Sequence, residues 1–512
     1  MESEVPTVSS QVESPFSPPL LAVLEALLRQ HPGVSAAKAS SHHPQLGQVT
    51  VHVVPNDEYL ASFLKGDAEE RKRLQTWRKT FDLTQLGKEA ASAEVGFNIA
   101  GWNSSYARQP IPEPAMREWV AHTVAEILSF APQEILEIGC GTGLLLLRIA
   151  SQCKRYTATD FAPAVLGKLR QQLEVMPGSW EGVSLLERAA DDFTGMAEDS
   201  FDTVVINSVL HYFPSVSYLI RVLEGAARVL KPGGRIFIGD VRSLPLLKAY
   251  CASVELYQAE GDVPLNELRE RVTRRRKLQD QLVISPAFFL AFGERNAKIS
   301  DVEIRVKRGR HDNELTRYRY NAVLHARSEP NNKTTVPWME WTNLQHGRAD
   351  LQRVLREEQP ETLAIRGIPN ARLNQDLFAL KRIFDPHASA TVADLQADLL
   401  AQQPNGIHPE FLHDDGDLAG YRVDLSWARC PEDGSYDAVF SRKNPNHQQS
   451  IAVDWPQLST AGADLWTYVN VLGANSLRQR LARELETFCQ QQAPPEFQSC
   501  SIQLVDSLPA TD

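Results

Sequence analysis

The clearest change in the hydrophobic pattern of the chain falls near residue 134. Ahead of it, apolar side chains recur at helical spacing and predict a helix with one buried face: Met116, Trp119, Val120, Thr123, Ile127 and Leu128. The next five residues, EILEI, form a continuous apolar run that is typical of a short buried strand. Three alternating glycines follow, and then LLLLRIASQC predicts a second helix. This order of strand, glycine-rich turn and helix is typical of a nucleotide-binding α/β unit.

Further strands follow with the pattern that a parallel sheet needs. RYTATD predicts a second strand that ends at Asp160, about 20 positions after the first glycine, where a carboxylate lies beside the glycine turn. LLERAADDF predicts a third strand that ends with two aspartates. SFDTVVINSVLHYFP predicts a fourth strand over 203–206, and Asn207, Ser208 and His211 then fall where ligands bind in open parallel sheets. A fifth strand in GRIFIGD and two alternating strands in ISDVEIRVKRG and RYRYNAVLHA complete the pattern.

The glycine spacing decides which ligand the turn can hold. A dinucleotide fingerprint needs a third glycine at the position of Leu144, whereas this chain has glycine at 139, 141 and 143. A phosphate-binding loop would need a lysine and a hydroxyl residue after its last glycine, and neither is present. A pyrophosphate ligand is therefore disfavoured. The turn allows close backbone approach by an adenosine-bearing ligand, which suits S-adenosylmethionine.

Composition and charge narrow the class of protein. The 512 residues are 43% hydrophobic and 23% charged, as in ordinary globular proteins. A net charge of −11 disfavours nucleic acid as a partner, and no apolar run approaches the length of a membrane span. The six cysteines contain no CxxC pair, which argues against a metal site or a disulfide framework and favours the cytoplasm. The acidic, Ser/Pro-rich residues 1–18 predict a flexible leader.

Several of these motifs together resemble one known family. GWNSSYARQPIPEPAMREW, ILEIGCGTG, YTATDF, INSVLHYFP, GDVRSLPLL and NELTRYRY closely resemble the methyltransferase domains that are embedded in the adenylation domains of nonribosomal peptide synthetases. Most of those domains methylate the nitrogen of an amino acid. The resemblance implies a class I, Rossmann-like α/β methyltransferase with a seven-stranded, mostly parallel sheet, α+β flanking regions and S-adenosylmethionine as cofactor.

The resemblance extends to both flanks and implies a division of the chain. Residues 19–65 resemble the first half of an adenylation C-terminal subdomain, and 473–512 resemble its second half. The methyltransferase domain is expected at 66–330, followed by an auxiliary α/β segment at 331–472 that we expect to pack as a lid or a partner surface. The large adenylation subdomain and the adenylation lysine are missing from the sequence, so we do not expect this chain to activate amino acids.

The resemblance also assigns cofactor-binding residues. The glycine turn and its preceding acid are expected at the methionine and ribose portion, Asp160 at the ribose, and Asp191 or Asp192 with Phe193 at the adenine. Asn207 and Ser208 are expected to border the reactive methyl group. The full set of cofactor-binding candidates is Glu137, Gly139, Gly141, Gly143, Asp160, Phe161, Asp191, Asp192, Phe193, Asn207 and Ser208.

Five residues are candidates for catalysis. His211 stands where these domains commonly carry glutamine, and its ordinary pKa near 6.5 suits a base, although a packing role is the alternative. Tyr106 is a candidate aromatic wall against the sulfonium or a core residue. Arg242 is a candidate clamp for a substrate carboxylate, Glu314 a candidate group for orienting or deprotonating an amine, and ion pairs are the alternative for both. Asn207 borders the methyl group or forms a turn.

These candidates lead to competing functional hypotheses. The first is a methyltransferase of nonribosomal-peptide-type biosynthesis that acts on an amino acid or aminoacyl group, either free or tethered to a peptidyl carrier protein. Nitrogen is the first acceptor, and oxygen or carbon on a free small molecule is the alternative. The other hypothesis is an inactive fold that is kept for docking to synthetase partners. Neither hypothesis involves a metal, a nucleic acid or a membrane.

Overall fold

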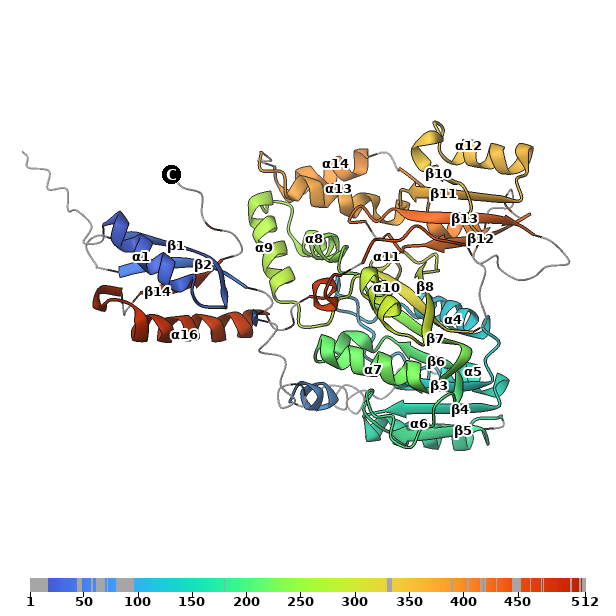
Figure 1. The fold of residues 1–512 in the computed structure, drawn as a ribbon. Helices are drawn as coiled ribbons and strands as arrows, with labels where there is room; N and C mark the ends of the chain where they lie inside the picture. The colour runs from blue at the N-terminus through green and yellow to red at the C-terminus, as the bar shows by residue number, and fades with distance from the viewer. Residues whose placement is uncertain are drawn as a thin grey trace, which may run out of the picture. The chain divides into compact units, whose positions relative to one another are not determined.

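The computed structural model separates two compact units, which are described in turn (Figure 1). The residues that the structure describes are 17–43, 48–56, 59–60, 70, 72–79, 96–178, 180–328, 334–387, 390–402, 405–414, 418, 420–429, 431–443, 453–460, 462–470, 472, 474–497, 500–505 and 508. Residues 1–16 of the expected leader therefore lie outside them. The first unit contains the described residues of 1–69, 277–280 and 471–512, and the second those of 70–276 and 281–470.

The first unit joins segments from both ends of the sequence. Its strands are β1 (Val34–His43), β2 (Gln48–Pro55) and β14 (Ser501–Leu504). Strand β1 is antiparallel to β2, and β14 is parallel to β2 on its other side. Helices α1 (Pro18–Leu28) and α16 (Ala474–Gln492) contribute leucines that are fully buried. The likeness of this unit to an adenylation subdomain stays a prediction.

The second unit is built on a twisted sheet whose central part has seven strands. They are β3 (Glu134–Ile138), β4 (Arg155–Asp160), β5 (Val183–Glu187), β6 (Phe201–Asn207), β7 (Leu230–Arg242), β8 (Ile299–Val306) and β9 (Arg319–Ala326). They lie in the order β5-β4-β3-β6-β7-β9-β8, with β3 to β7 parallel and β9 antiparallel to both of its neighbours. The prediction of a class I fold with a seven-stranded, mostly parallel sheet is confirmed.

Helices cover both faces of this sheet because its central strands are buried on both sides. On one face lie α4 (Glu113–Leu128), α5 (Leu146–Ile149) and α6 (Pro163–Val175), which share a core with apolar side chains of β3, β4, β6 and β7. The other face is covered by α7 (Val216–Val229) and α10 (Pro286–Arg295) (Figure 1). The predicted helix after the glycines is short, and a 3-10 turn over Ala150–Gln152 continues it.

The segment after β9 extends the same sheet. Strands β12 (Tyr421–Ser426), β13 (Tyr436–Arg442), β11 (Thr362–Ile368) and β10 (Trp338–Glu340) bring it to eleven strands among the described residues. The junction is the pairing of Ser426 in β12 with Arg305 in β8. The remaining helices are α8 (Leu247–Gln258), α9 (Leu265–Lys277), α11 (Glu314–Arg317), α12 (Arg348–Arg353), α13 (Asn374–Ile383), α14 (Val392–Ala401) and α15 (Pro409–Asp414).

Helices of the auxiliary segment pack directly on the methyltransferase part. α13 and α14 share a hydrophobic core with α8 and α9, in which Leu268, Val272, Ile383 and Val392 are fully buried. Among the described residues, no helix has both the length and the apolar character that crossing a membrane requires.

Candidate active site

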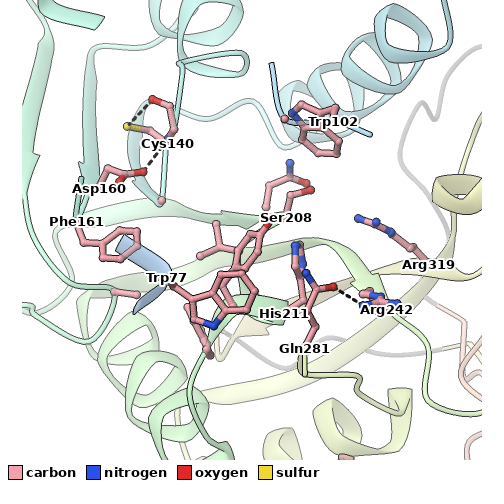
Figure 2. Close-up of a pocket in the computed structure, with 18 of the residues that line it drawn as sticks. Trp77, Trp102, Cys140, Asp160, Phe161, Ser208, His211, Arg242, Gln281 and Arg319 are labelled. Atoms are coloured by element: carbon pink, nitrogen blue, oxygen red, sulfur yellow. Dashed lines mark hydrogen bonds between the residues drawn. The ribbon is translucent and has the colours of Figure 1, made fainter. Parts of the chain in front are cut away.

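A cavity of about 730 Å³ lies at the carboxyl ends of the parallel strands of the second unit. Figure 2 shows that Asp160 and Phe161 lie on one side of it, Ser208 near the middle, and His211, Gln281, Arg242 and Arg319 on the other side. We call the first side the cofactor end and the other side the acceptor end. This place is the one where open parallel sheets bind ligands.

The glycine turn forms the wall of the cofactor end. Gly139, Gly141 and Gly143 have φ values of +76°, +50° and +80°, a region that residues with a Cβ atom rarely adopt. A Cβ atom on Gly139 would stand 2.5 Å from Val209 Cγ2, and one on Gly143 would stand 2.6 Å from Leu169 Cδ1. Glycine is therefore required by both conformation and packing at these two positions.

Asp160 connects the glycine turn to the end of β4. Its Oδ2 accepts a hydrogen bond from Gly141 N at 2.9 Å, and its Oδ1 accepts one from Ala162 N at 2.9 Å. The side chain is buried and lines the cavity. Asp160 therefore fixes the turn, and its expected contact with the ribose stays a prediction.

Glu137 is a buried acid at the floor of the cofactor end. Its Oε2 accepts a hydrogen bond from the Tyr156 hydroxyl at 2.9 Å, and both residues are almost completely buried. Burial raises the pKa of Glu137 to about 7; the Asp160 carboxylate adds to the rise and the Tyr156 hydroxyl opposes it. The Glu137 carboxyl therefore changes its charge within the physiological range.

Asn207 is the last residue of β6 and Ser208 follows it, and both line the cavity between its two ends. Asn207 Oδ1 is buried and has no hydrogen-bond partner within the part of the chain that the structure describes. Ser208 has a φ of +57° and donates its hydroxyl to Asp240 Oδ2. A Cβ atom on Gly239 would stand 2.0 Å from Asn207 Oδ1, so the Asn207 amide lies close against strand β7 and needs glycine there.

Two guanidinium groups dominate the acceptor end. Arg319 Nη1 pairs with Asp240 Oδ2 at 2.5 Å, whereas Arg242 donates to Gln281 Oε1 and lies over the Tyr250 ring. Burial would raise the pKa of Asp240, but Arg319 and Lys307 outweigh it and hold this pKa at about 2. Asp240 therefore stays ionised and offsets one of the cations.

His211 is buried beside both guanidinium groups. Its pKa is well below the ordinary value, first because burial disfavours the imidazolium and then because Arg319 and Arg242 repel it. The ring packs against the Tyr212 ring, with centroids 4.1 Å apart and the two planes tilted by 49°. Neutral imidazole is therefore its form at physiological pH.

Glu314 forms the opposite wall of the acceptor end. It is the first residue of α11, which Asn313 caps, and it is only 5% exposed. Its carboxylate accepts hydrogen bonds from Ser105 N at 2.9 Å, Ser105 Oγ at 3.0 Å and Ser104 Oγ at 3.2 Å. These bonds fix its orientation in the cavity wall.

The structure brings most predicted residues to the cavity and leaves four outside its lining. The lining candidates are Glu137, Gly139, Gly141, Asp160, Phe161, Asp192, Asn207, Ser208, His211, Arg242 and Glu314. Gly143 packs under Leu169 instead. Strand β5 ends at Glu187, so the two aspartates lie in the following loop, where Asp191 turns away to pair with Arg221 at 3.2 Å.

The other two residues outside the lining are aromatic. The Phe193 ring lies against Gly225 of α7, away from the cavity. The Tyr106 hydroxyl lies 2.6 Å from Ser253 Oγ, and its ring packs edge-on against Tyr257. The structure therefore places neither ring in the cavity lining, which differs from the expectation for Phe193 and, for Tyr106, agrees with the alternative of a packing role.

Some cavity residues were missed by the sequence analysis. Arg319 lies directly opposite Arg242 in the β7–β9 pairing, a register that no local motif reveals. Gln281 and Tyr250 follow no recognisable pattern and reach Arg242 only through the fold. Trp77 lies in the helical residues 72–79 and lines the cavity. Its ring packs against the Tyr212 ring, with centroids 4.9 Å apart.

Comparisons with known proteins agree with the geometry. A family model described as "Methyltransferase domain" matches residues 136–236. Chondramide synthase cmdD of Chondromyces crocatus is 36% identical over 506 residues, which are 95% of this chain and 12% of that protein. Cyclosporin synthetase simA of Tolypocladium inflatum is 29% identical over 474 residues, 87% of this chain and 3% of that protein. The chain thus spans a small part of the length of these relatives.

The likeness to solved structures is distant. N-methyltransferase NodS from Bradyrhizobium japonicum WM9 is 20% identical, with a TM-score of 0.28, and the match covers 42% of this chain and 98% of that one.

The residues at the cofactor end fit S-adenosylmethionine. The glycine turn allows close backbone approach, and the Glu137 and Asp160 carboxylates face the cavity as acceptors for hydroxyl groups. Strand order, glycine turn, cavity and sequence relatives agree. The second unit thus contains a class I, S-adenosylmethionine-dependent methyltransferase domain of the type found in nonribosomal peptide synthetases.

Proposed function

We propose that this domain methylates the amino nitrogen of an amino acid or aminoacyl group in nonribosomal-peptide-type biosynthesis, with the acceptor either free or carried by a peptidyl carrier protein. One observation carries the proposal: the cavity that begins at the glycine turn continues, past Asn207 and Ser208, to a wall of Arg242, Arg319 and Glu314. An acceptor with both a carbonyl-type oxygen and an amine matches that wall.

The acceptor end offers a complementary group for each part of an aminoacyl unit. Arg242 presents a guanidinium whose donors suit a carboxylate or a thioester carbonyl. The Glu314 carboxylate, fixed by Ser104 and Ser105, faces the same space and attracts an amine. Holding the acceptor at both points is a positioning effect, which can supply a large part of a rate enhancement.

The charge at the acceptor end also favours the reactive form of the amine. When bound, S-adenosylmethionine supplies an electrophilic methyl group, and only an amine with a free lone pair can attack it. The guanidinium groups of Arg242 and Arg319 lower the pKa of an ammonium placed beside them. Burial and then the same guanidinium groups lower the pKa of His211, so its imidazole is neutral and offers a ring nitrogen that can take up the released proton.

Aromatic side chains limit the access of water to the cavity. Trp102 packs on Trp119 with ring centroids 4.8 Å apart, and both line the cavity. Trp77 covers another part of it against Tyr212 (Figure 2). Water is a competing nucleophile and also weakens electrostatic contacts, so this enclosure favours transfer to the acceptor.

The test is mass spectrometry of the chain incubated with S-adenosylmethionine and a panel of amino acids, each free and loaded on a carrier protein. A gain of one CH2 unit on the amino nitrogen, located by fragmentation, would support the proposal. Transfer only to hydroxyl or carbon acceptors would replace it with the alternative chemistry. Cofactor binding without transfer to any acceptor would favour the docking hypothesis.

A further inference from the structure

Much of the wall at the acceptor end comes from one short stretch, residues 307–319, which we call the acceptor segment. Glu314, Leu315, Tyr318 and Arg319 of this segment line the cavity. The segment connects β8 to β9 and includes α11, a helix of a single turn. A helix of one turn has little stability of its own. The position of α11 therefore depends on the residues packed around it.

Two side chains of the auxiliary segment form hydrogen bonds with the beginning of the acceptor segment. Arg372, which is 5% exposed, donates to Lys307 O at 2.6 Å and also to Gly309 O. Glu410 accepts hydrogen bonds from Gly309 N at 2.8 Å and from Arg308 Nε at 2.9 Å. The two side chains come from different parts of the auxiliary segment and fix the same loop.

A second contact with the auxiliary segment lies near the end of the acceptor segment, beside the cavity. Asp376 of α13 accepts a hydrogen bond from Arg317 Nη1 at 3.1 Å and is only 7% exposed. Burial raises the pKa of Asp376, and Arg317 and Tyr318 oppose this rise. One buried carboxylate of the auxiliary segment thus holds a cation that directly precedes the cavity-lining Tyr318.

These contacts belong to a closed series of bonded residues around the acceptor end, which we call the circuit. The Tyr318 hydroxyl lies 2.8 Å from Ser253 Oγ, which lies 2.6 Å from the Tyr106 hydroxyl. The neighbouring Ser105 N donates to Glu314 at 2.9 Å, and α11 leads from Glu314 back to Arg317 and Asp376. Side chains that are locked by such bonds hold a site within the tolerance that binding needs.

We propose that Asp376 is a positioning residue that sets the affinity for the acceptor by fixing the acceptor segment from the auxiliary segment. This inference rests on the proposed function. Without its carboxylate, the half-buried Arg317 loses its ion-pair partner and α11 loses its bond to α13, so the wall formed by Glu314 and Tyr318 loosens. The glycine turn has no part in this circuit, so cofactor binding does not depend on it.

The first test compares Asp376→Asn and Asp376→Leu with Asp437→Asn. Asp437 is also buried, and it pairs with Arg429 at 2.6 Å inside the auxiliary segment, so its variant controls for the loss of a buried ion pair. We expect Asp376→Leu to raise the acceptor KM about tenfold and Asp376→Asn less, since asparagine keeps an oxygen that can accept from Arg317. The Kd for S-adenosylmethionine, measured by calorimetry, should change less than about twofold.

A double variant separates positioning from stability. Arg317→Met with Asp376→Leu removes both charges, and replacing a buried ion pair by apolar groups is often neutral for stability. We expect the double variant to regain the unfolding free energy that Asp376→Leu loses, while the acceptor KM stays raised because the bond between α11 and α13 is still missing. A KM that returns to the wild-type value together with stability would overturn the proposal.

Hydrogen exchange gives a readout that needs no turnover. Asp376→Leu should speed amide exchange in residues 307–319 and 104–106 and leave residues 139–143 unchanged. Unchanged exchange in 307–319, or a cofactor Kd that rises in parallel with the acceptor KM, would overturn the proposal. If the wild-type chain methylates no acceptor, the proposed function fails, and the exchange result still decides whether Asp376 holds the acceptor segment.

Discussion

The two ends of the cavity are built in different ways. The cofactor end is made by backbone conformation and a few buried acids within residues 137–161, where β3 and β4 end side by side. The acceptor end is made by charged side chains from β7, β9 and α11 together with Gln281, and residues of the auxiliary segment contact it from outside the cavity. Local sequence thus encodes cofactor binding, whereas acceptor recognition depends on contacts between distant segments.

The largest effect should come from the backbone of the cofactor end. Gly139→Ala places a Cβ atom at φ +76° and 2.5 Å from Val209 Cγ2, so the turn must move. We expect the Kd for S-adenosylmethionine, measured by calorimetry, to rise about 100-fold, or about 3 kcal/mol. Gly167→Ala is the matched control because Gly167 lies in α6 with open space at its Cβ position.

The control should leave cofactor affinity unchanged and stabilise the fold by up to about 1 kcal/mol, because alanine is the better helix former. A Gly139→Ala variant that binds the cofactor within about threefold of the wild type would show that the turn is not the binding element.

The sequence predicted the cofactor end well because its signals are local. Strands β3 and β4 have the bounds that the apolar runs predicted, and Asp160 reaches the glycine turn as expected. The prediction was less accurate at β5, which ends at Glu187 because the aspartates after it bend away. Side chains in that loop are placed by tertiary partners such as Arg221, which periodicity does not detect.

At the acceptor end, the largest expected effect is from Arg242. Arg242→Met removes a guanidinium that suits a carboxylate or carbonyl, a charged hydrogen-bonded contact worth about 2 kcal/mol, so the acceptor KM should rise about 30-fold. The cofactor Kd should stay within about twofold, because Arg242 lies at the other end of the cavity. Arg274→Met, on the exposed face of α9, controls for the lost charge. Equal rises in the acceptor KM and the cofactor Kd would show that the two ends do not bind their ligands separately.

The acceptor end could be predicted only in part. Arg242 and Glu314 follow recognisable motifs, but Arg319 comes beside Arg242 only through the antiparallel pairing of β7 with β9. Asp376 is a more extreme case, since it lies 59 residues from Arg317 in the sequence and meets it only after α13 packs on α8. Such contacts depend on the register and packing of distant segments, which a pattern along one sequence does not contain.

The next effect concerns the charge at the cofactor end. Burial raises the pKa of Glu137 from 4.5 to about 7, so the fold loses stability from this group as pH rises from 4.5 through 7. Cofactor binding should show the opposite trend, because the ionised carboxylate is the better acceptor for hydroxyl groups and attracts the sulfonium. We expect the affinity for S-adenosylmethionine to be about tenfold weaker at pH 6 than at pH 8.

Glu137→Gln keeps the shape of this side chain and removes its titration. Calorimetry from pH 6 to pH 8 should therefore give a flatter profile for the variant than for the wild type. Parallel profiles would assign the pH dependence to another group, such as the amino group of the cofactor itself.

The smallest effect tests where Tyr106 belongs. If its ring faced the sulfonium, Tyr106→Phe would keep the contact and Tyr106→Ala would weaken cofactor binding. The structure places its hydroxyl on Ser253 and its ring on Tyr257, outside the cavity lining. Tyr106→Phe should therefore cost about 1 kcal/mol of unfolding free energy and raise the acceptor KM about twofold to threefold. The Kd for the cofactor should stay within about twofold of the wild-type value in both variants. A marked rise of this Kd in Tyr106→Ala alone would show that the ring contacts the cofactor.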